Sequence, residues 1–114
     1  GSVKNIVGKV IRKMVKKFGC NPKDLVINVS ASLGPCCGEF SDPYNELPEN
    51  LHKYILENNH VDFWKATQDQ CIKEGVLEKN VHIDGNCTVC NNEKYFSYRG
   101  DNGETGRNAV VVWI

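Results

Sequence analysis

The sequence predicts an α+β domain in which helices pack against a mixed β-sheet. Two observations indicate this fold class. Apolar residues recur at helical spacing over residues 3–18, whereas residues 25–29 and 109–114 are short, continuous runs rich in β-branched side chains. The chain has 114 residues, 40% of them hydrophobic and 25% charged, so a single domain over 1–114 with its own core is expected.

The clearest predicted helix covers residues 3–18 and is amphipathic. Its apolar side chains recur at intervals of three and four residues, which places them along one face. They are Val3, Ile6, Val7, Val10, Ile11, Met14, Val15 and Phe18. Gly19 can adopt the left-handed backbone conformation that commonly ends a helix. The helix is therefore expected to end before Gly19 and to be followed by a turn at residues 21–24.

Shorter elements are expected along the rest of the chain. The run at 25–29 predicts a buried strand, which leads into a tight loop at 34–40 containing two glycines and a proline. Residues 41–47 are expected to be irregular. Helices are expected to begin at Pro48 and to span Phe63–Glu74, the second one capped by Asp62 and closed by Gly75. Further strands are expected at 81–83, 95–98 and 109–114.

The net charge is zero, but the charges are unevenly distributed. Residues 1–24 hold seven basic side chains and a single acid, Asp24. Such a segment can contact nucleic acid or a membrane surface. Because the basic residues fall on the polar face of the predicted helix, a solvated face that meets acidic surface elsewhere is the favoured interpretation, and no nucleic-acid or membrane partner is expected.

No stretch approaches the roughly 20 apolar residues that a membrane span requires. No secretory signal peptide is recognised at the start of the chain, so a cytoplasmic location with reduced cysteines is expected.

Six cysteines are present, at positions 20, 36, 37, 71, 87 and 90. Cys87 and Cys90 form a CxxC motif, which with a second pair would suggest a zinc site. The candidate second pair is Cys36 and Cys37, and adjacent cysteines rarely both reach one tetrahedral ion. The favoured interpretation is therefore two loop cysteines without metal, with a zinc site or a redox pair as alternatives.

Other polar residues suggest a pocket without defining a reaction. His52, His60 and His82 are scattered and are interpreted as surface or capping residues. The loop from Gly34 through Pro35 to Glu39 offers thiols, flexible backbone and a carboxylate. Arg99 and Arg107 flank a glycine-rich turn that also holds Asp101, and guanidinium groups suit phosphate or carboxylate. These residues alone indicate no more than an anion-binding pocket.

Four segments, in order along the chain, resemble motifs of the laccase-domain or polyphenol oxidase family. Residues 32–40 (S-L-G-P-C-C-G-E-F) resemble its S-I-G-P-C-C-Y-E-V loop, and residues 87–90 (C-T-V-C) resemble its C-T-x-C. Residues 61–66 (V-D-F-W-K-A) with Gly75-Val76 resemble v-D-L-w-x-A … G-V, and residues 96–99 (F-S-Y-R) with 105–107 (T-G-R) resemble F-F-S-Y-R-R-D … T-G-R. The sequence departs from the pattern at Gly38, where an aromatic is usual, and at Gly100, where a second arginine is common.

The resemblance implies that this chain is the C-terminal half of a larger laccase-domain α/β sandwich. Full-length members are metal-dependent enzymes to which phosphorolysis of purine nucleosides, deamination of adenosine and copper-dependent oxidation of phenols are attributed. Their zinc or copper is held by two histidines and a cysteine of the N-terminal half, which ends in an H-A-G-W-R-G motif whose last residue would be Gly1. No metal ligand of the family is therefore expected in this chain, and the chain alone is expected to be inactive.

The implied role of this chain is to contribute fold and pocket walls next to a missing N-terminal half or a partner chain. The candidate wall residues are Gly34, Pro35, Cys36, Cys37, Glu39, Arg99 and Arg107. The loop at 34–39 and Arg99 are expected to be neighbours, because both should lie at one edge of the sheet. The alternatives are a non-enzymatic interaction module and a small cysteine-rich zinc domain built on Cys87 and Cys90.

Overall fold

The structure is a computed structural model, and the residues it describes run from Ser2 to Trp113. Gly1, the expected end of a family motif, and Ile114, the expected end of the last strand, lie outside the described residues. The helices are α1 (Ile6–Phe18), α2 (Pro43–Glu46) and α3 (Phe63–Lys73), and the strands are β1 (Ile27–Val29) and β2 (Val81–Ile83). Single 3-10 turns or short 3-10 helices lie at Pro22–Asp24, Glu49–Tyr54, Glu57–Asn59 and Glu78–Asn80.

Helix α1 confirms the amphipathic helix, although it begins three residues later than predicted. Asn5 is its N-cap, and the side-chain oxygen of Asn5 accepts a hydrogen bond of 3.1 Å from the backbone N–H of Gly8. At the other end Gly19 has a φ of 67°, and its N–H donates to the carbonyl of Val15. The predicted glycine C-cap is therefore confirmed. On the polar face Arg12 forms an ion pair with Glu74, as expected for a basic surface that meets acidic groups elsewhere.

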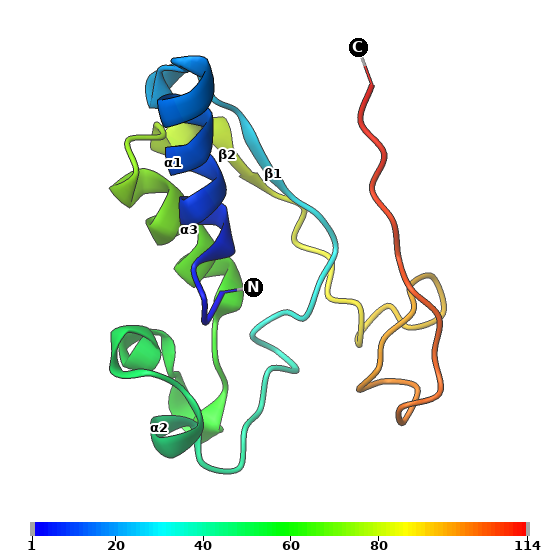
Figure 1. Cartoon of the computed structure of the whole chain (residues 1–114). Helices are drawn as coiled ribbons and strands as arrows, with labels where there is room; N and C mark the ends of the chain where they lie inside the picture. The colour runs from blue at the N-terminus through cyan, green and yellow to red at the C-terminus, as the bar shows by residue number, and fades with distance from the viewer. Residues whose placement is uncertain (1, 114) are drawn as a thin grey trace.

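Helices α1 and α3 lie side by side and share a core with the strands (Figure 1). The centre of this core is Ile11, which is 1% exposed. Its other buried members are Cys71, Val76 and Val81, with Val7, Val15, Leu25 and Ile27 packed around them. The predicted contact between the apolar face of the first helix and the sheet is confirmed for Val7, Ile11 and Val15, which pack with residues of β1 and β2. Other members of the predicted apolar face are exposed, namely Val3, Ile6, Val10 and Phe18.

A second core cluster lies at the other end of α3. It is built on Leu47, Leu51, Tyr54, Val61 and Ala66. Here the structure corrects two expectations. The segment expected to be irregular contains the helix α2, with Pro43 buried at its first turn, and the helix expected from Pro48 is a 3-10 helix. Proline suits the first turn of a helix because the missing N–H would have no partner there, which applies equally to Pro43.

Strands β1 and β2 form a two-stranded parallel sheet. Ile27 pairs with Val81 and Val29 with Ile83, and α3 lies on the connection between the strands. The pairing continues beyond the strands, because Ser32 and Cys87 form a further parallel bridge. The carboxyl ends of both strands therefore lead into the cysteine-containing segments.

Two predicted strands are absent from the described residues. Residues 95–98 lie in a loop, and residues 109–113 form no ladder with another segment. The apolar side chains Val110, Val111, Val112 and Trp113 are 69–85% exposed. Residues with high β-propensity are those that pack well on a pleated, half-buried surface. In the described part of the chain, no neighbouring strand offers such a surface to residues 109–113. The predicted final strand is therefore wrong for residues 109–113.

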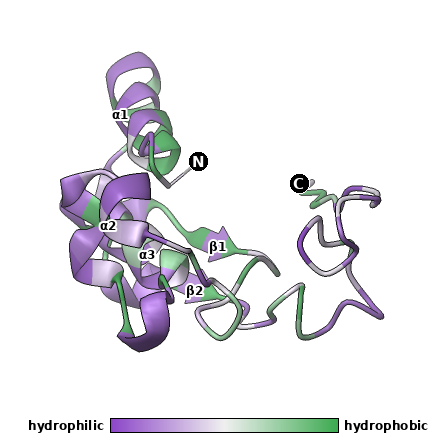
Figure 2. Cartoon of the chain, turned by 90° about the horizontal axis from the view of Figure 1, so that it is seen from below, coloured by the Kyte–Doolittle hydropathy of each residue, from purple (hydrophilic) through white to green (hydrophobic). Residues whose placement is uncertain are grey.

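The C-terminal region after β2 lies apart from the helices (Figure 1). Figure 2 shows the same separation from below, with a hydrophobic end of the chain next to the C label. The molecule measures 43 × 34 × 22 Å along its principal axes. Among the described residues, no helix has the length and apolar character needed to cross a bilayer.

Candidate functional site: a thiol cluster and an adjacent arginine

Gly34 begins the site at the point where the chain leaves β1. A Cβ atom at this position would lie 2.8 Å from the ring of Trp64 and 3.1 Å from the Cβ of Cys87, so only glycine fits without displacement. The backbone N–H of Gly34 donates a hydrogen bond of 3.3 Å to Cys87 Sγ. Its carbonyl accepts from the N–H of Cys37 in a turn. Gly34 therefore fixes the cysteine-containing loop against the second cysteine segment.

Ser32 makes hydrogen bonds that align the loop after β1 with the segment that contains Cys87. The N–H of Ser32 donates to the carbonyl of Asn86, and the carbonyl of Ser32 accepts from the N–H of Thr88 at 3.0 Å. The hydroxyl of Ser32 accepts a hydrogen bond of 2.7 Å from Trp64 Nε1, which ties both segments to α3. The parallel register of the strands is thus carried forward into the loops.

This register brings together the four thiols of Cys36, Cys37, Cys87 and Cys90. Their sulfur atoms all lie within 4.8 Å of one another. Cys90 Sγ lies 3.3 Å from Cys36 Sγ and 3.4 Å from Cys37 Sγ. Cys87 is buried, Cys37 is half-buried, and Cys36 and Cys90 are exposed. The sequence argument that adjacent cysteines rarely converge on one point does not hold for Cys36 and Cys37 in this fold.

The thiols of this cluster differ in acidity. Burial alone would raise the pKa of Cys87, but backbone N–H groups, including that of Gly34, hydrogen-bond its sulfur and lower its pKa to about 6. Burial and a hydrogen bond to Cys90 raise the pKa of Cys36 to about 12. The hydrogen bond to Cys90, followed by burial, raises the pKa of Cys37 to about 11. One thiolate is favoured in the cluster, and its charge opposes ionisation of the neighbours.

Arg99 lies against the same loop. Its Nη1 donates a hydrogen bond of 2.7 Å to the carbonyl of Glu39, and its guanidinium carbon lies 5.7 Å from the centre of the Phe40 ring. The expected proximity of Arg99 to the loop at 34–39 is confirmed. Arg107 is different, because it is exposed and its Nη1 donates to the carbonyl of its own neighbour, Gly106. The structure does not bring Arg107 to this loop.

Asp101 organises the loop that carries Arg99. Its Oδ2 accepts hydrogen bonds from Thr105 Oγ1, from the backbone N–H of Ser97 and from Asn92 Nδ2, at 2.8–3.2 Å. The hydrogen bond from Thr105, followed by those from Ser97 and Asn92, lowers the pKa of this carboxyl. The sequence places Asp101 in the glycine-rich turn between Arg99 and Arg107 without indicating this role. A carboxylate flanked by serine and threonine four residues away on either side is a signal for such a loop.

Two shallow cavities flank the thiol cluster. One, of about 500 Å³, is lined by Pro35, Cys36, Leu56, Glu57, Asn58 and His60. The other, of about 390 Å³, is lined by Arg99 with Ala31, Ser32, Leu33, Thr88, Phe96, Ser97, Tyr98 and Asn108. Three of the candidate wall residues line these cavities, Pro35 and Cys36 the first and Arg99 the second.

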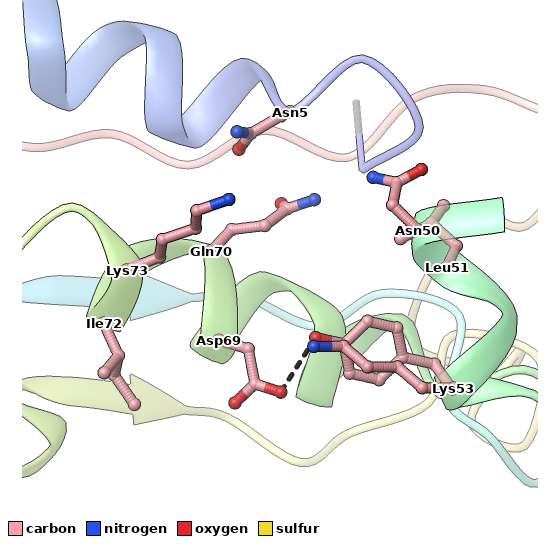
Figure 3. A pocket seen from close by; sticks show the side chains of 9 residues that line it. Asn5, Asn50, Leu51, Lys53, Asp69, Gln70, Ile72 and Lys73 are labelled. Carbon is pink, nitrogen blue, oxygen red and sulfur yellow. Dashed lines mark hydrogen bonds between the residues drawn. The ribbon is translucent and has the colours of Figure 1, made fainter. Parts of the chain in front are cut away.

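A third cavity, of about 430 Å³, lies between α1, α3 and the 3-10 helix Glu49–Tyr54 (Figure 3). In it the hydroxyl of Tyr54 donates a hydrogen bond of 2.8 Å to Asp69 Oδ2 (Figure 3). Burial would raise the pKa of Asp69, but the hydrogen bond from Tyr54 and the nearby Lys65 lower it. Burial and the same hydrogen bond raise the pKa of Tyr54 to about 12. This cavity was not anticipated from the sequence.

The histidines take structural positions. His52 Nε2 hydrogen-bonds the carbonyl of Leu47, and His60 Nδ1 hydrogen-bonds the carbonyl of Pro35 at 2.6 Å. His82 lies on β2 and is exposed. Among residues 2–113 no histidine joins the four thiols in a group of potential metal ligands.

The fold and the site define this chain as an α+β protein with a thiol cluster at the carboxyl end of a parallel strand pair. A family model described as multi-copper polyphenol oxidoreductase laccase matches residues 1–114, so the chain belongs to this laccase-domain family. The family description implies copper. The described donors do not fit a histidine-based copper centre, because the grouped ligands are four thiols.

Several curated relatives are named purine nucleoside phosphorylases. The human purine nucleoside phosphorylase LACC1 is 27% identical over 123 residues, covering 100% of this chain and 29% of the relative. The purine nucleoside phosphorylase YlmD of Geobacillus stearothermophilus is 26% identical, covering 98% of this chain and 44% of the relative. The chain thus spans less than half the length of these relatives.

Solved structures show the same fold. The crystal structure of YlmD from Geobacillus stearothermophilus matches with a TM-score of 0.80 at 24% identity, covering 93% of this chain and 43% of that one. The hypothetical protein YfiH of Bacillus licheniformis matches with a TM-score of 0.74 at 20% identity and the same coverage. The expected fold class, helices with a sheet in part of a laccase-domain fold, is confirmed.

Proposed function

We propose that this chain is the C-terminal part of a laccase-domain purine nucleoside phosphorylase, to which it contributes fold and pocket walls. The observation that carries the proposal is the match of almost the whole chain to relatives that bear this name, at 26–27% identity. The metal ligands of the nucleoside site would come from outside this chain, from the N-terminal half or a partner chain. The metal, zinc or copper, would polarise the substrate or activate the attacking phosphate or water.

The proposed wall consists of the loop at 34–39 together with Arg99. Their contact through Glu39 makes one continuous surface, and the guanidinium of Arg99 is suited to a phosphate or a substrate hydroxyl. Gly34, Pro35, Cys36 and Cys37 would present backbone groups beside it. Arg107 belongs to this proposal only through the motif resemblance, since its contacts lie elsewhere.

The segment at 109–113 supports a larger assembly. It carries four exposed apolar side chains at its end, Val110 to Trp113, and has the β-propensity of a strand. A contiguous exposed apolar segment of this kind marks an interaction site. We propose that it pairs with a strand of the missing half, which would bury these side chains. The same proposal includes two further points: the longer protein would lie in the cytoplasm, and it would also deaminate adenosine.

Phosphorolysis by the longer protein tests this function. The protein that combines this chain with its upstream segment is expected to release adenine from adenosine, or hypoxanthine from inosine, only when inorganic phosphate is present. The 114-residue chain alone is expected to stay at the level of a heat-treated control. Absence of phosphate-dependent release by the folded longer protein would contradict the proposal, as would turnover by the short chain alone. A folded protein that binds a partner without turnover would support the interaction-module alternative.

A further inference from the structure

We infer that Cys36, Cys37, Cys87 and Cys90 together bind one zinc ion in a structural site that is separate from the metal of the nucleoside site. All four sulfur atoms converge within 4.8 Å, and none of them belongs to the histidine-containing ligand set that the family resemblance implies. This inference does not depend on the proposed function, because the ion would be present whether or not the protein turns over nucleosides.

The distances suit a tetrahedral ion. With a zinc–sulfur bond of about 2.3 Å, the sulfur atoms of a tetrathiolate site lie about 3.8 Å apart. Cys90 Sγ lies 3.3 and 3.4 Å from the sulfurs of Cys36 and Cys37, and no pair in the cluster exceeds 4.8 Å. Shifts of a few tenths of an ångström to about 1 Å in the sulfur positions would complete the tetrahedron.

The backbone already holds two of the ligand segments in place. The bridge between Ser32 and Cys87 fixes their relative position, and Gly34 allows the loop to approach Cys87 closely. The N–H of Gly34 donates to Cys87 Sγ, and such hydrogen bonds to a ligating sulfur orient the ligand and stabilise its negative charge. These contacts tie the site to the strand pair, so the thiols are not a chance encounter of mobile side chains.

A cation explains why four thiols share one site. Zinc is bound by thiolates, and a cation at the centre of four sulfurs that lie within 4.8 Å of one another would stabilise their negative charge. A disulfide accounts for the arrangement less well, because it uses two sulfurs at about 2.05 Å. Cys90 lies almost equally close to Cys36 and to Cys37, so no single disulfide pair is selected.

The donor set also indicates the metal and its role. A tetrahedral set of four sulfurs is typical of zinc or iron–sulfur centres, and zinc is the ion usually held by a single site of four cysteines. Four protein ligands leave no open position for substrate, which makes such a site structural. Its effect would be to clamp residues 36–37 to residues 87–90, at the end of a strand pair that is only three residues long.

Elemental analysis of the protein purified without chelator under reducing conditions tests the inference. About one zinc per chain is expected, beyond any ion held by the nucleoside site of the longer protein. Exposed Cys36 is the variant of choice, because Cys36→Ser removes one ligand without disturbing the buried core. Its zinc affinity is expected to fall by more than the roughly tenfold to hundredfold that loss of an outer-shell partner costs. Cys20→Ser, a half-buried cysteine outside the cluster, is the matched control and should keep the full zinc content.

Cobalt substitution provides a second measurement on the unmodified protein. Cobalt(II) added to the zinc-free protein is expected to give the intense visible absorption and sulfur-to-cobalt charge-transfer bands of a tetrahedral tetrathiolate, and zinc should abolish both. Zinc content unaffected by Cys36→Ser, stoichiometric iron or copper in place of zinc, or a Cys90 disulfide that persists in the protein as purified under reducing conditions would each overturn the inference. These readouts involve no nucleoside, so their failure is distinguishable from failure of the proposed phosphorolysis.

Discussion

Arg99 Nη1 donates a hydrogen bond of 2.7 Å to the main-chain oxygen of Glu39, a residue 60 positions earlier in the sequence. The same guanidinium lies over the ring of Phe40. Since the C-terminal region otherwise lies apart from the helices, this contact is one of the connections that join it to the cysteine-containing loop (Figure 1).

Replacing Arg99 by alanine tests this connection. Loss of the hydrogen bond and of the contact with Phe40 is expected to lower the free energy of unfolding by about 1 kcal/mol, since the side chain is exposed to solvent. Arg107→Ala is the control, because Arg107 is exposed and its guanidinium donates a hydrogen bond to the carbonyl of its own neighbour, Gly106; its effect should stay within about 0.5 kcal/mol. Urea denaturation of both variants measures the difference. Equal effects would show that the Arg99 contact contributes nothing specific.

Ile11 occupies the centre of the core between α1, α3 and the strands. Ile11→Asp is expected to destabilise the protein by about 3 kcal/mol or more, because a buried charge without a partner replaces a core side chain. Val10→Asp is the matched control, since Val10 is the preceding residue of the same helix and is 50% exposed. Its cost should be about 1 kcal/mol or below. Thermal and urea unfolding that showed equal costs would contradict the assignment of the buried face.

Gly34→Ala is expected to destabilise the protein by about 1–3 kcal/mol, the usual cost of forcing an extra methyl group into a packed site. The added Cβ would lie 2.8 Å from the Trp64 ring. Trp64→Leu supplies the test of this cause, because removal of the ring relieves the clash. The double variant should therefore lose less than the sum of the two single variants. Strict additivity would mean that the cost of Gly34→Ala arises somewhere else.

Protonation of Asp69 at acidic pH should account for part of the decrease in the free energy of unfolding. The folded-state pKa of Asp69 is lowered, so the stability contributed by its carboxylate is fully present above the ordinary pKa of about 3.9 and is lost as the pH falls through the folded-state value. Asp69→Asn should flatten the decline of the unfolding free energy over this acidic range. Tyr54→Phe should flatten it partly, because Tyr54 supplies the main hydrogen bond to Asp69. An unchanged slope in both variants would contradict the role assigned to this pair.

The helices α1 and α3 and the strands β1 and β2 were predictable because their patterns are local. The apolar spacing before Gly19, and Asp62 as the N-cap of α3, are contained within single segments of the sequence. The expected final strand was wrong for residues 109–113, because a strand requires a partner and sequence pattern alone does not show whether a partner is present.

The sequence favoured two separate loop cysteines over a cluster of four thiols for a related reason. Adjacent cysteines such as Cys36 and Cys37 rarely both reach one ion, but the parallel pairing of β1 with β2 is a tertiary relationship that the spacing does not show. That pairing sets Ser32 beside Cys87, and the turn after Gly34 then directs both adjacent thiols towards Cys90. The proximity of Arg99 to the loop was predicted from a position at the edge of the sheet, and it holds although residues 95–98 lie in a loop and not in a strand. The organising role of Asp101 depends on the geometry of its side chain, which the sequence pattern does not show.

The parallel pairing of Ile27 with Val81 also has a kinetic consequence. More than 50 residues lie between these partners, and closing a loop of that size costs about 3.5 kcal/mol of chain entropy before any contact in the sheet forms. Non-local pairing of this kind slows folding relative to helical proteins of similar length, so α1 and α3 should form before the strands meet. The four sulfur atoms come together only when that late step is complete. An ion at their centre would therefore slow unfolding more than it accelerates folding.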